Sequence, residues 1–254
     1  MKLVTFNIRC DFGQDAENNF EYRKPLILKR IAAEKPDLIG FQEVLPHVQK
    51  WLRENLTGYT VVGCGRSADF QDEAMTIAVR NDTTELLGLE TFWLSPDPYL
   101  PGSRYPGQSE CPRICTSVIV NNQEMPGPIR VYNTHLDHIG AQARMQGLSQ
   151  ILRQMEDDSD RVTIPAVLMG DFNAVPDSVE LSPIEQFESL SLSDLTAGIP
   201  ITYHNYHRGE EAAAKIDYIF ATPPFHANPA VCWEDHEDGV YLSDHYPVCV
   251  EIFA

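Results

Sequence analysis

The order of apolar segments along the chain is the feature that most limits its fold. Strand-like stretches at residues 3–8 and 37–42 have a helical pattern between them, whereas those at 60–62, 75–79 and 85–92 follow one another without an intervening helix. A helical crossover is typical of parallel neighbours, and a direct connection is typical of antiparallel ones. We therefore expect an α/β (α+β) fold, a four-layer sandwich in which two packed, mostly antiparallel or mixed β-sheets are flanked by helices.

The remaining segments extend this pattern to the end of the chain. Further strands are expected at residues 115–120, 129–133, 167–170, 216–220, 230–233 and 248–253. Helices are expected from Pro25 to about Lys35, from Pro46 onward, and around 145–155. Residues 94–112 are rich in proline and glycine and predict a long irregular loop. No internal repeat or linker interrupts the pattern, so residues 1–254 are expected to form a single domain.

The charge of the chain limits its partners. It has 37 acidic and 19 basic residues, a formal net charge of −18, and no run of lysine and arginine. A protein that holds long nucleic acid through its phosphates uses a basic face. The composition therefore disfavours a processive nuclease and a protein that binds anionic lipid, and no membrane partner is expected. Oligomeric state is not indicated.

Cysteine spacing and apolar run length indicate the compartment. The cysteines, which show no paired zinc spacing, are Cys10, Cys64, Cys111, Cys115, Cys232 and Cys249. We expect mostly buried thiols in a reducing compartment. No apolar run is long enough to cross a membrane and no signal segment precedes the first strand, so a cytoplasmic location is expected.

Polar side chains that can bind a metal or move a proton recur at the strand ends. They are Asn7, Glu43, His135, Asp171, Asn173, Asp217, Asp244 and His245. A carboxylate at the end of a buried strand is costly to bury unless it is paired or bound to a cation. One such residue alone is commonly a cap or turn residue. Several that converge would form an oxygen-rich site suited to Mg²⁺ or Mn²⁺.

The adjacent residues Asp244 and His245 can both belong to one site only if the backbone has a particular geometry. Neighbouring side chains on a regular strand point to opposite faces, so both can share a site only where the backbone turns. Pro247 follows directly, and proline interrupts the hydrogen-bond ladder of a strand. The sequence thus favours a turn before the last strand, and the alternative is a strand cap with a solvated histidine.

Six stretches carry a resemblance that spans nearly the whole chain. They are Thr5-Phe6-Asn7-Ile8, Gln42-Glu43, Thr134-His135, Gly170-Asp171-Phe172-Asn173, Ile216-Asp217-Tyr218 and Ser243-Asp244-His245. In this order they closely resemble the endonuclease/exonuclease/phosphatase superfamily, which has the DNase I-like fold. The resemblance implies a hydrolase of phosphoester bonds.

Within that superfamily the chain is most similar to a bacterial branch related to the deadenylase and nocturnin-like enzymes. The residues that carry this similarity are Asn7-Ile8-Arg9, Asp15, Asn18, Phe20, Arg23, Glu73 and Pro112-Arg113-Ile114. Two positions depart from the pattern. Apurinic-site endonucleases have an aspartate where this chain has Arg9, which leaves one acidic metal contact to another residue. The branch often has tryptophan where this chain has Ser117.

The resemblance implies how the metal and the attacking water are held. Glu43 is implied as the principal ligand of Mg²⁺ or Mn²⁺, with Asn7 and Asp244 completing or orienting the shell of the metal. Asp171 is implied to position or deprotonate the water, and Asn173 to hold water or a phosphoryl oxygen.

The histidines have implied roles at the phosphoryl group. Asp217 and His245 are implied to form a carboxylate–imidazole pair in which the acid favours the imidazolium. That cation would stabilise charge on phosphorus, and His135 would bind a phosphoryl oxygen or assist the leaving group.

Three residues are weaker candidates for substrate binding. Arg113 and Arg144 have the bidentate geometry that suits a phosphate, although arginines on helices and loops are often only solvated. His138 follows the strand that ends at His135, together with Asp137, and is a candidate for contact with substrate.

Three functions are compatible with these observations. The favoured one is a divalent-metal-dependent phosphoester hydrolase, of phosphodiesterase or phosphatase type, acting on a small phosphorylated substrate by in-line attack of water. The first alternative is a nuclease of the same fold, such as a 3′–5′ exoribonuclease, with nucleic acid as its partner. The second is a non-catalytic binding module, which would have lost a key acid or histidine, and none of these is missing.

Overall fold

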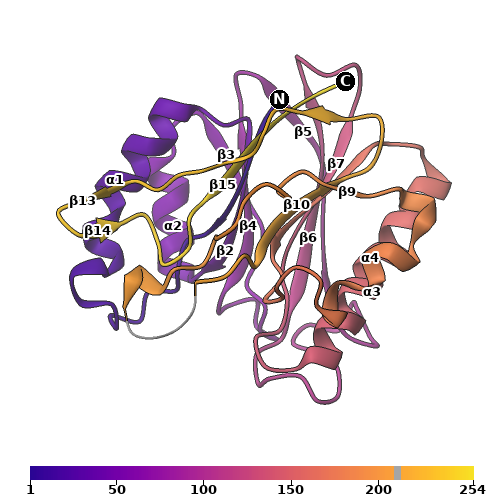
Figure 1. The fold of residues 1–254 in the computed structure, drawn as a ribbon, viewed down its shortest axis with the longest axis horizontal. Helices are drawn as coiled ribbons and strands as arrows, with labels where there is room; N and C mark the ends of the chain where they lie inside the picture. Colours follow the sequence, from indigo (N-terminus) through magenta and orange to yellow (C-terminus); the bar gives the residue numbers. More distant parts are fainter. Residues whose placement is uncertain (209–212) are drawn as a thin grey trace.

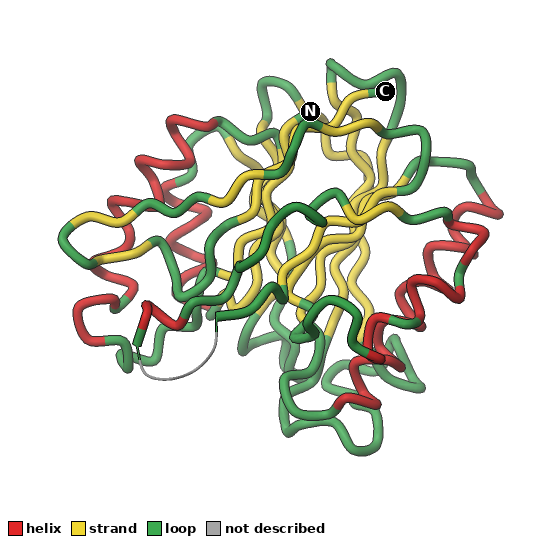
Figure 2. Tube along the Cα trace, viewed as in Figure 1, coloured by secondary structure: helices red, strands yellow, loops and turns green. Residues whose placement is uncertain are grey.

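A computed structural model describes residues 1–208 and 213–254. Figure 1 shows two β-sheets packed against each other with helices on both outer sides, and Figure 2 shows the strands gathered in the middle of the molecule. The predicted four-layer sandwich is confirmed. Among the described residues, no helix is long and apolar enough to cross a membrane.

The first sheet contains both ends of the chain. Its strands are β1 (Lys2–Asn7), β2 (Leu38–Val44), β3 (Tyr59–Val62), β4 (Ala74–Arg80), β11 (His226–Ala227), β12 (Val231–Cys232) and β15 (Val248–Phe253). Their order is β11-β15-β1-β2-β4-β3, and β12 also pairs with β15. Helix α1 (Phe20–Glu34) connects β1 to β2, and these two strands run parallel.

The second sheet is formed by the middle of the chain. Its strands are β5 (Thr84–Trp93), β6 (Ile114–Asn122), β7 (Ile129–His135), β8 (Ala166–Asp171), β9 (Ser193–Asp194) and β10 (Asp217–Ala221). Their order is β5-β6-β7-β8-β10-β9. Helix α3 (Ala141–Arg161) connects the parallel strands β7 and β8, and the other pairs are antiparallel. A separate hairpin pairs β13 (His236–Glu237) with β14 (Val240–Tyr241).

Helices cover the outer face of each sheet (Figure 1). Helices α1 and α2 (Pro46–Asn55) pack on the first sheet, and α3 and α4 (Pro183–Gln186) lie beside the second. Short 3₁₀ helices occupy the connections at η1 (Ala16–Asn18), η2 (Val179–Leu181), η3 (Glu188–Leu190) and η4 (Asn205–His207).

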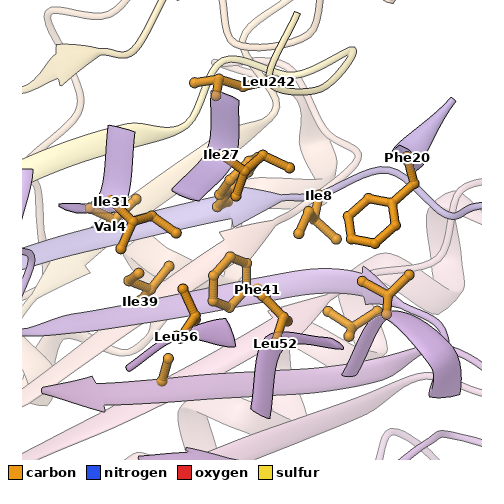
Figure 3. Packing of buried hydrophobic residues seen from close by; sticks show 14 of the residues in the cluster. Val4, Ile8, Phe20, Ile27, Ile31, Ile39, Phe41, Leu52, Leu56 and Leu242 are labelled. Atoms are coloured by element: carbon orange, nitrogen blue, oxygen red, sulfur yellow. The ribbon is translucent and has the colours of Figure 1, made fainter. Parts of the chain in front are cut away.

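Successive side chains of the central strands divide between two apolar layers, as the two-residue period of a strand requires. In β1, Leu3 packs between the sheets and Val4 packs toward the helices, and Leu38 and Ile39 of β2 divide in the same way. Figure 3 shows the helix-side layer, where Leu52 of α2 lies over the sheet. Both faces of these strands are buried, which explains their nearly continuous apolar sequences.

The ends of the central strands meet at one edge of the sandwich. Asn7 at the end of β1 lies opposite Gln42 in β2, and His135 at the end of β7 lies opposite Asp171 at the end of β8. The antiparallel strand β10 begins at the same edge, with Asp217 opposite Asp171, and β15 begins beside the end of β1. The topology therefore brings the predicted polar residues together.

A buried amide pair fixes the two sheets against each other near this edge. Gln42 Nε2 donates to Asn133 Oδ1 at 2.6 Å, and Asn133 Nδ2 donates to the carbonyl oxygens of Phe41 at 2.9 Å and Thr76 at 3.2 Å. Gly40 permits this approach, since a Cβ there would lie 2.9 Å from Asn133 Cγ. Asn133 thus connects β7 of the second sheet to β2 and β4 of the first.

Replacing Asn133 with alanine is expected to lower the free energy of unfolding by about 2–4 kcal/mol, because two carbonyls and the Gln42 amide lose a buried partner. Urea unfolding followed by circular dichroism measures the change. Asn121→Ala, at an exposed position of β6, is the control and is expected to change stability by less than about 0.5 kcal/mol. Equal stabilities for the two variants would contradict this role for Asn133.

The helix expected to begin at Pro25 begins earlier, at Phe20, and Pro25 lies inside it. The reason is tertiary. Phe20 is buried in the core, and the fully buried Arg23 donates to the carbonyl oxygens of Asn18 at 2.7 Å and Ile8 at 2.6 Å. These contacts stabilise an additional turn, which outweighs the hydrogen bond lost at the proline.

The cysteines are less buried than expected. Cys115 and Cys249 are buried, whereas the other four are half-buried, because they lie at strand ends and in loops. All six are free thiols. Residues 94–112 contain no helix or strand, as predicted.

Candidate active site

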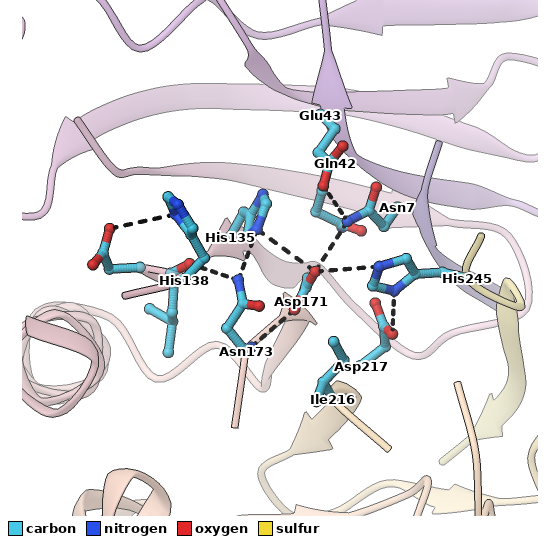
Figure 4. Close-up of polar contacts among 12 residues, drawn as sticks. Asn7, Gln42, Glu43, His135, His138, Asp171, Asn173, Ile216, Asp217 and His245 are labelled. Carbon is cyan, nitrogen blue, oxygen red and sulfur yellow. Dashed lines mark hydrogen bonds and ion pairs between the residues drawn. The ribbon is translucent and has the colours of Figure 1, made fainter. Parts of the chain in front are cut away.

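The polar residues at the shared edge surround a pocket of about 640 Å³. The predicted site residues that line it are Glu43, Arg113, His135, His138, Asp171, Asn173, Asp244 and His245. Asn7 and Asp217 are not among the lining residues and lie directly behind them, in hydrogen-bond contact with Glu43 and His245. Figure 4 shows Asp171 in the middle of this group, with side chains from both sheets pointing toward it.

Glu43 reaches the pocket through an irregularity in β2. Its φ of 61° and a break in the pairing register between Phe41 and Val44 turn the carboxylate out of the strand. Asn7 Nδ2 donates to Glu43 Oε1 at 2.9 Å, and the backbone N–H of Cys10 donates to Oε2 at 2.8 Å. Burial opposes the charged form, but the electrostatic interaction with His135, followed by these hydrogen bonds, outweighs it and holds the pKa of Glu43 below its usual value. The group is therefore a carboxylate at neutral pH.

Asp171 lies at the centre of the polar group. Its Oδ2 accepts from Asn7 Nδ2 at 2.9 Å and lies 3.6 Å from His135 Nε2 and 3.8 Å from His245 Nε2. Burial, and then the negative charge of Asp217, raise the pKa of Asp171 to about 7. A carboxyl group with such a pKa can take up and release a proton near neutral pH.

Gly170 allows β8 to place Asp171 in this position. Its φ is 146°, and a Cβ at this residue would lie 1.9 Å from the carbonyl oxygen of Thr134 in β7. Only glycine fits such an approach between two backbones. The close approach of the two backbones thus explains why the first residue of the Gly-Asp-Phe-Asn stretch is glycine.

His135 and Asn173 lie side by side at the ends of β7 and β8. Asn173 Nδ2 is 2.9 Å from His135 Nε2 and donates to the Leu136 carbonyl oxygen at 3.1 Å, while its backbone N–H donates to Asp171 Oδ1 at 2.8 Å. Burial, and then the charge of Arg113, lower the pKa of His135 well below its usual value, so the ring is neutral at neutral pH. Its buried Nδ1 has no hydrogen-bond partner among the described residues.

Asp217 and His245 are in direct contact. His245 Nδ1 donates to Asp217 Oδ2 at 2.8 Å. Burial opposes the imidazolium, but Asp217, followed by Asp171 and Asp244, raises the pKa of His245 to about 10. The ring is therefore positively charged at neutral pH, and its Nε2 is the nitrogen directed toward Asp171.

The backbone leaves strand geometry between β14 and β15, so that Asp244 and His245 both reach the pocket. Ser243 Oγ donates to Asp244 Oδ1 at 3.1 Å, and Arg9 Nη1 lies 3.4 Å from Asp244 Oδ2. Burial raises the pKa of Asp244 above its usual value. Arg9 also pairs with Asp15 at 3.1 Å and lines the pocket, so this position contributes a cation and not an acidic side chain.

Of the candidate substrate-binding residues, Arg113 and His138 line the pocket and contact each other. Arg113 Nη2 lies 2.7 Å from His138 Nδ1, and Arg113 Nε lies 3.5 Å from Asp137 Oδ1. Arg113 is 4% exposed, and its Nη1 has no hydrogen-bond partner among the described residues.

Arg144 is not among the pocket-lining residues. Its guanidinium donates to Glu180 Oε1 at 2.7 Å and to the carbonyl oxygen of Asp137 at 2.9 Å. The Asp137 carboxylate is likewise engaged locally, since it accepts from the backbone N–H of Gly140 at 2.7 Å and of Ser109 at 3.2 Å. Both side chains hold the loop before α3 in place.

Further pocket residues have no motif that marks them in the sequence. Arg66, Cys10, Cys111 and Tyr203 line the pocket together with Glu73, which the sequence marks only as a feature of the bacterial branch. Their loops are far apart along the chain, so only the tertiary fold reveals the cluster.

The residues present fit a hard divalent cation. Glu43, Asp171 and Asp244 supply carboxylate oxygens, the ligand type that Mg²⁺ and Mn²⁺ prefer. Ligand atoms of Glu43, His135 and Asp171 lie within 4.8 Å of one another. Asn7 presents Nδ2 to the carboxylates and its Oδ1 accepts the backbone N–H of Arg9 at 3.0 Å, so it orients the acids in this arrangement.

Solved structures resemble this chain over nearly its whole length. An endonuclease/exonuclease/phosphatase protein from Bacteroides vulgatus is 32% identical, with 99% of this chain and 97% of that chain covered and a TM-score of 0.89. A mannosyl-6-phosphatase from Bacteroides thetaiotaomicron is 26% identical, with 100% of both chains covered and a TM-score of 0.89. The catalytic domain of human nocturnin, solved with a bound sulfate, is 20% identical, with 99% and 92% covered and a TM-score of 0.75, a likeness of fold.

A search of curated proteins found no match. The family described as "Endonuclease/Exonuclease/phosphatase family" matches residues 4–245. That span contains every residue of the pocket described above, and the 32% identical structure supports the same assignment. The chain therefore belongs to the endonuclease/exonuclease/phosphatase family.

Proposed function

We propose that this protein is a divalent-metal-dependent phosphoester hydrolase that cleaves small phosphorylated substrates by in-line attack of water on phosphorus. Enzymes of this family hydrolyse phosphoester bonds. The observation that carries the proposal is the convergence of Glu43, Asp171, Asp244 and His245 in one pocket with His135. This set supplies metal ligands, a proton acceptor and a cation within reach of one phosphoryl group.

Glu43 is the principal metal ligand in this proposal, with Asp244 in the same shell and Asn7 holding the Glu43 carboxylate in place. A magnesium or manganese ion bound there supplies positive charge that offsets the charge of the phosphoryl oxygens. The short distances from Glu43 to Asn7 and to the Cys10 N–H fix the carboxylate before any ligand arrives.

Asp171 orients the attacking water and accepts its proton. Its central position and a pKa near 7 suit this role. Asn173 fixes Asp171 Oδ1 through its backbone N–H, at 2.8 Å, and Asp171 Oδ2 lies among Asn7, His135 and His245. The Asn173 amide is placed to hold the water or a phosphoryl oxygen.

His245 donates a hydrogen bond from its charged ring to a phosphoryl oxygen, and Asp217 keeps that ring protonated and oriented. His135 is neutral, so it stabilises a phosphoryl oxygen as a hydrogen-bond donor without adding charge. Arg113 and His138 are placed to contact the remainder of the substrate.

The purified protein tests this proposal directly. We expect hydrolysis of bis-p-nitrophenyl phosphate, p-nitrophenyl phosphate or inositol phosphates in magnesium or manganese, and loss of that activity in a chelator with recovery when metal is returned. Full activity in chelator would contradict the metal dependence. Exclusive turnover of short oligoribonucleotides would favour the alternative, a nuclease such as a 3′–5′ exoribonuclease.

Small substrates are expected to be turned over more efficiently than RNA. The chain carries a net charge of −18 and therefore repels a polyanion such as RNA. At physiological ionic strength salt weakens this repulsion at distances beyond about 8 Å, but not at closer range. The mannosyl-6-phosphatase relative, which spans the whole chain, supports a small phosphorylated substrate. The measurement is kcat/KM for a small diester and for an RNA of about twenty nucleotides, at low and at physiological salt. An advantage of about tenfold or more for the RNA at physiological salt would overturn this preference.

A further inference from the structure

The turn that connects β3 to β4, at residues 64–73, presents two charged side chains to the active-site pocket. Arg66 and Glu73 face each other across this turn, with the Arg66 N–H donating to the Glu73 carbonyl oxygen at 3.1 Å, and Gly65 pairs with Ala74 as an isolated bridge. Trp93 Nε1 donates to the Arg66 carbonyl oxygen at 2.6 Å. These contacts fix the turn to β4 and β5, so both side chains are held rigidly.

The two side chains form a buried ion pair on the wall of the pocket. Arg66 Nη1 donates to Glu73 Oε2 at 2.8 Å, and Arg66 Nε donates to Asp72 Oδ2 at 2.9 Å. Arg66 is 5% exposed and Glu73 is 7% exposed, yet both line the pocket. Neither contributes to the metal-binding and proton-transfer roles proposed above.

Arg113 and His138 extend this surface. Both line the same pocket, and the buried Arg113 Nη1 has no hydrogen-bond partner among the described residues. An unpartnered buried donor beside a pocket indicates a ligand atom that completes it. We call the four residues Arg66, Glu73, Arg113 and His138 the polar wall.

The polar wall is poorly suited to a second phosphate. Glu73 would repel it, and Arg66 is already shared between Glu73 and Asp72. It is also poorly suited to a nucleobase, because bases are bound by stacking on aromatic side chains. Among the described pocket-lining residues the one Phe, Tyr or Trp side chain is Tyr203, whose ring lies 5.0 Å from that of His245.

The polar wall instead matches neutral groups that both donate and accept hydrogen bonds. A carboxylate accepts from a hydroxyl, and a guanidinium donates to one, so neighbouring hydroxyls satisfy an Arg–Glu pair together. We propose that the polar wall binds the hydroxyl groups of a polyol, such as a sugar, and that the preferred substrates are phosphate esters of polyols. This inference rests on the proposed phosphoester hydrolysis, with the phosphate held at Glu43 and His245.

Matched pairs of phosphate esters test the inference. Hexose 6-phosphates and glycerol 3-phosphate carry hydroxyls, whereas cyclohexylmethyl phosphate and propyl phosphate lack them, and all four are esters of primary alcohols with similar leaving groups. For the wild-type protein in magnesium, we expect kcat/KM to be at least about tenfold higher for the hydroxyl-bearing member of each pair, since a hydrogen bond to a charged group contributes this much. Equal values within both pairs would overturn the inference.

Glu73→Gln is expected to reduce this discrimination ratio by about tenfold, chiefly through KM for the hydroxyl-bearing ester. Glu34→Gln is the matched control. Glu34 also forms an ion pair, in which its Oε2 lies 3.0 Å from Lys2 Nζ, but it does not line the pocket. Its ratio is expected to equal that of the wild type. Thermal unfolding of both variants checks that the fold is retained, and Arg113→Met, which removes the unpartnered donor, provides a second reading if Glu73→Gln does not fold.

Equilibrium binding separates this inference from the proposed function. Titration calorimetry of glucose 6-phosphate and propyl phosphate, with magnesium and the Asp171→Asn protein, measures discrimination without turnover. A preference for the hydroxyl-bearing ligand that Glu73→Gln removes supports the polar wall even if no phosphoester is hydrolysed. Hydrolysis with a ratio that neither Glu73→Gln nor Arg113→Met changes would leave the proposed function standing and overturn the polar wall.

Discussion

Replacing Glu43 with glutamine is expected to lower kcat by about a hundredfold or more and to weaken the apparent affinity for magnesium. Glutamine keeps the shape of the side chain, but its one carbonyl oxygen can accept from only one of the two donors, Asn7 Nδ2 and the Cys10 N–H. The lost hydrogen bond lies at the pocket, so the fold is expected to remain intact with a small loss of stability. What it removes is the negative charge that attracts the cation. The measurement is kcat as a function of magnesium concentration, with thermal unfolding alongside.

The control is Glu85→Gln, an identical chemical change at an exposed position on β5. It is expected to leave both kcat and the magnesium dependence at wild-type values. Wild-type rates for Glu43→Gln at limiting magnesium would remove Glu43 from the role of principal ligand.

The second large effect is expected at His245. His245→Ala is expected to lose about 10²–10⁴-fold in kcat/KM at every pH, because it removes the cation that faces the phosphoryl group. Asp217→Asn is expected to act differently. Asp217 raises the pKa of His245 to about 10, so without its charge the imidazolium loses its proton at a lower pH. Activity that needs the imidazolium falls as pH rises through that pKa, and the alkaline limb of the pH–rate profile therefore moves toward acid.

A pH–rate profile of kcat/KM from about pH 5 to pH 10 separates the two variants. His245→Ala lowers the whole curve, whereas Asp217→Asn shifts one limb of it. An unchanged alkaline limb in Asp217→Asn would show that Asp217 does not control the charge of His245.

The family and the fold could be predicted from the sequence because both depend on local patterns. Short stretches that end strands, such as Gly170-Asp171-Phe172-Asn173, keep their order along the chain, and the two-residue and helical periods distinguish the crossovers from the hairpins. The residues proposed for the site could be selected from the sequence for the same reason. Each follows an apolar strand, and strand ends that share an edge are brought together by topology.

Features that depend on tertiary contacts could not be predicted in this way. Helix α1 begins at Phe20 because Arg23 binds carbonyl groups of distant loops, which no helix signal records. The sequence gives the same prediction for Arg113 and Arg144. In the structure, Arg113 lines the pocket, whereas Arg144 pairs with Glu180. Arg66 carries no motif, and its position at the pocket follows from the turn that ends at β4.

The placement of the pocket between the two sheets links activity to the state of the core. The first sheet supplies Asn7 and Glu43, and the second supplies His135, Asp171 and Asp217, so neither sheet alone contains the proposed catalytic set. Loss of docking between the sheets would separate these groups while each sheet kept its own backbone hydrogen bonds. During refolding, activity should therefore return later than the circular dichroism of the strands, and during gentle denaturation it should disappear first. The turnover rate therefore reports whether the two sheets are docked against each other.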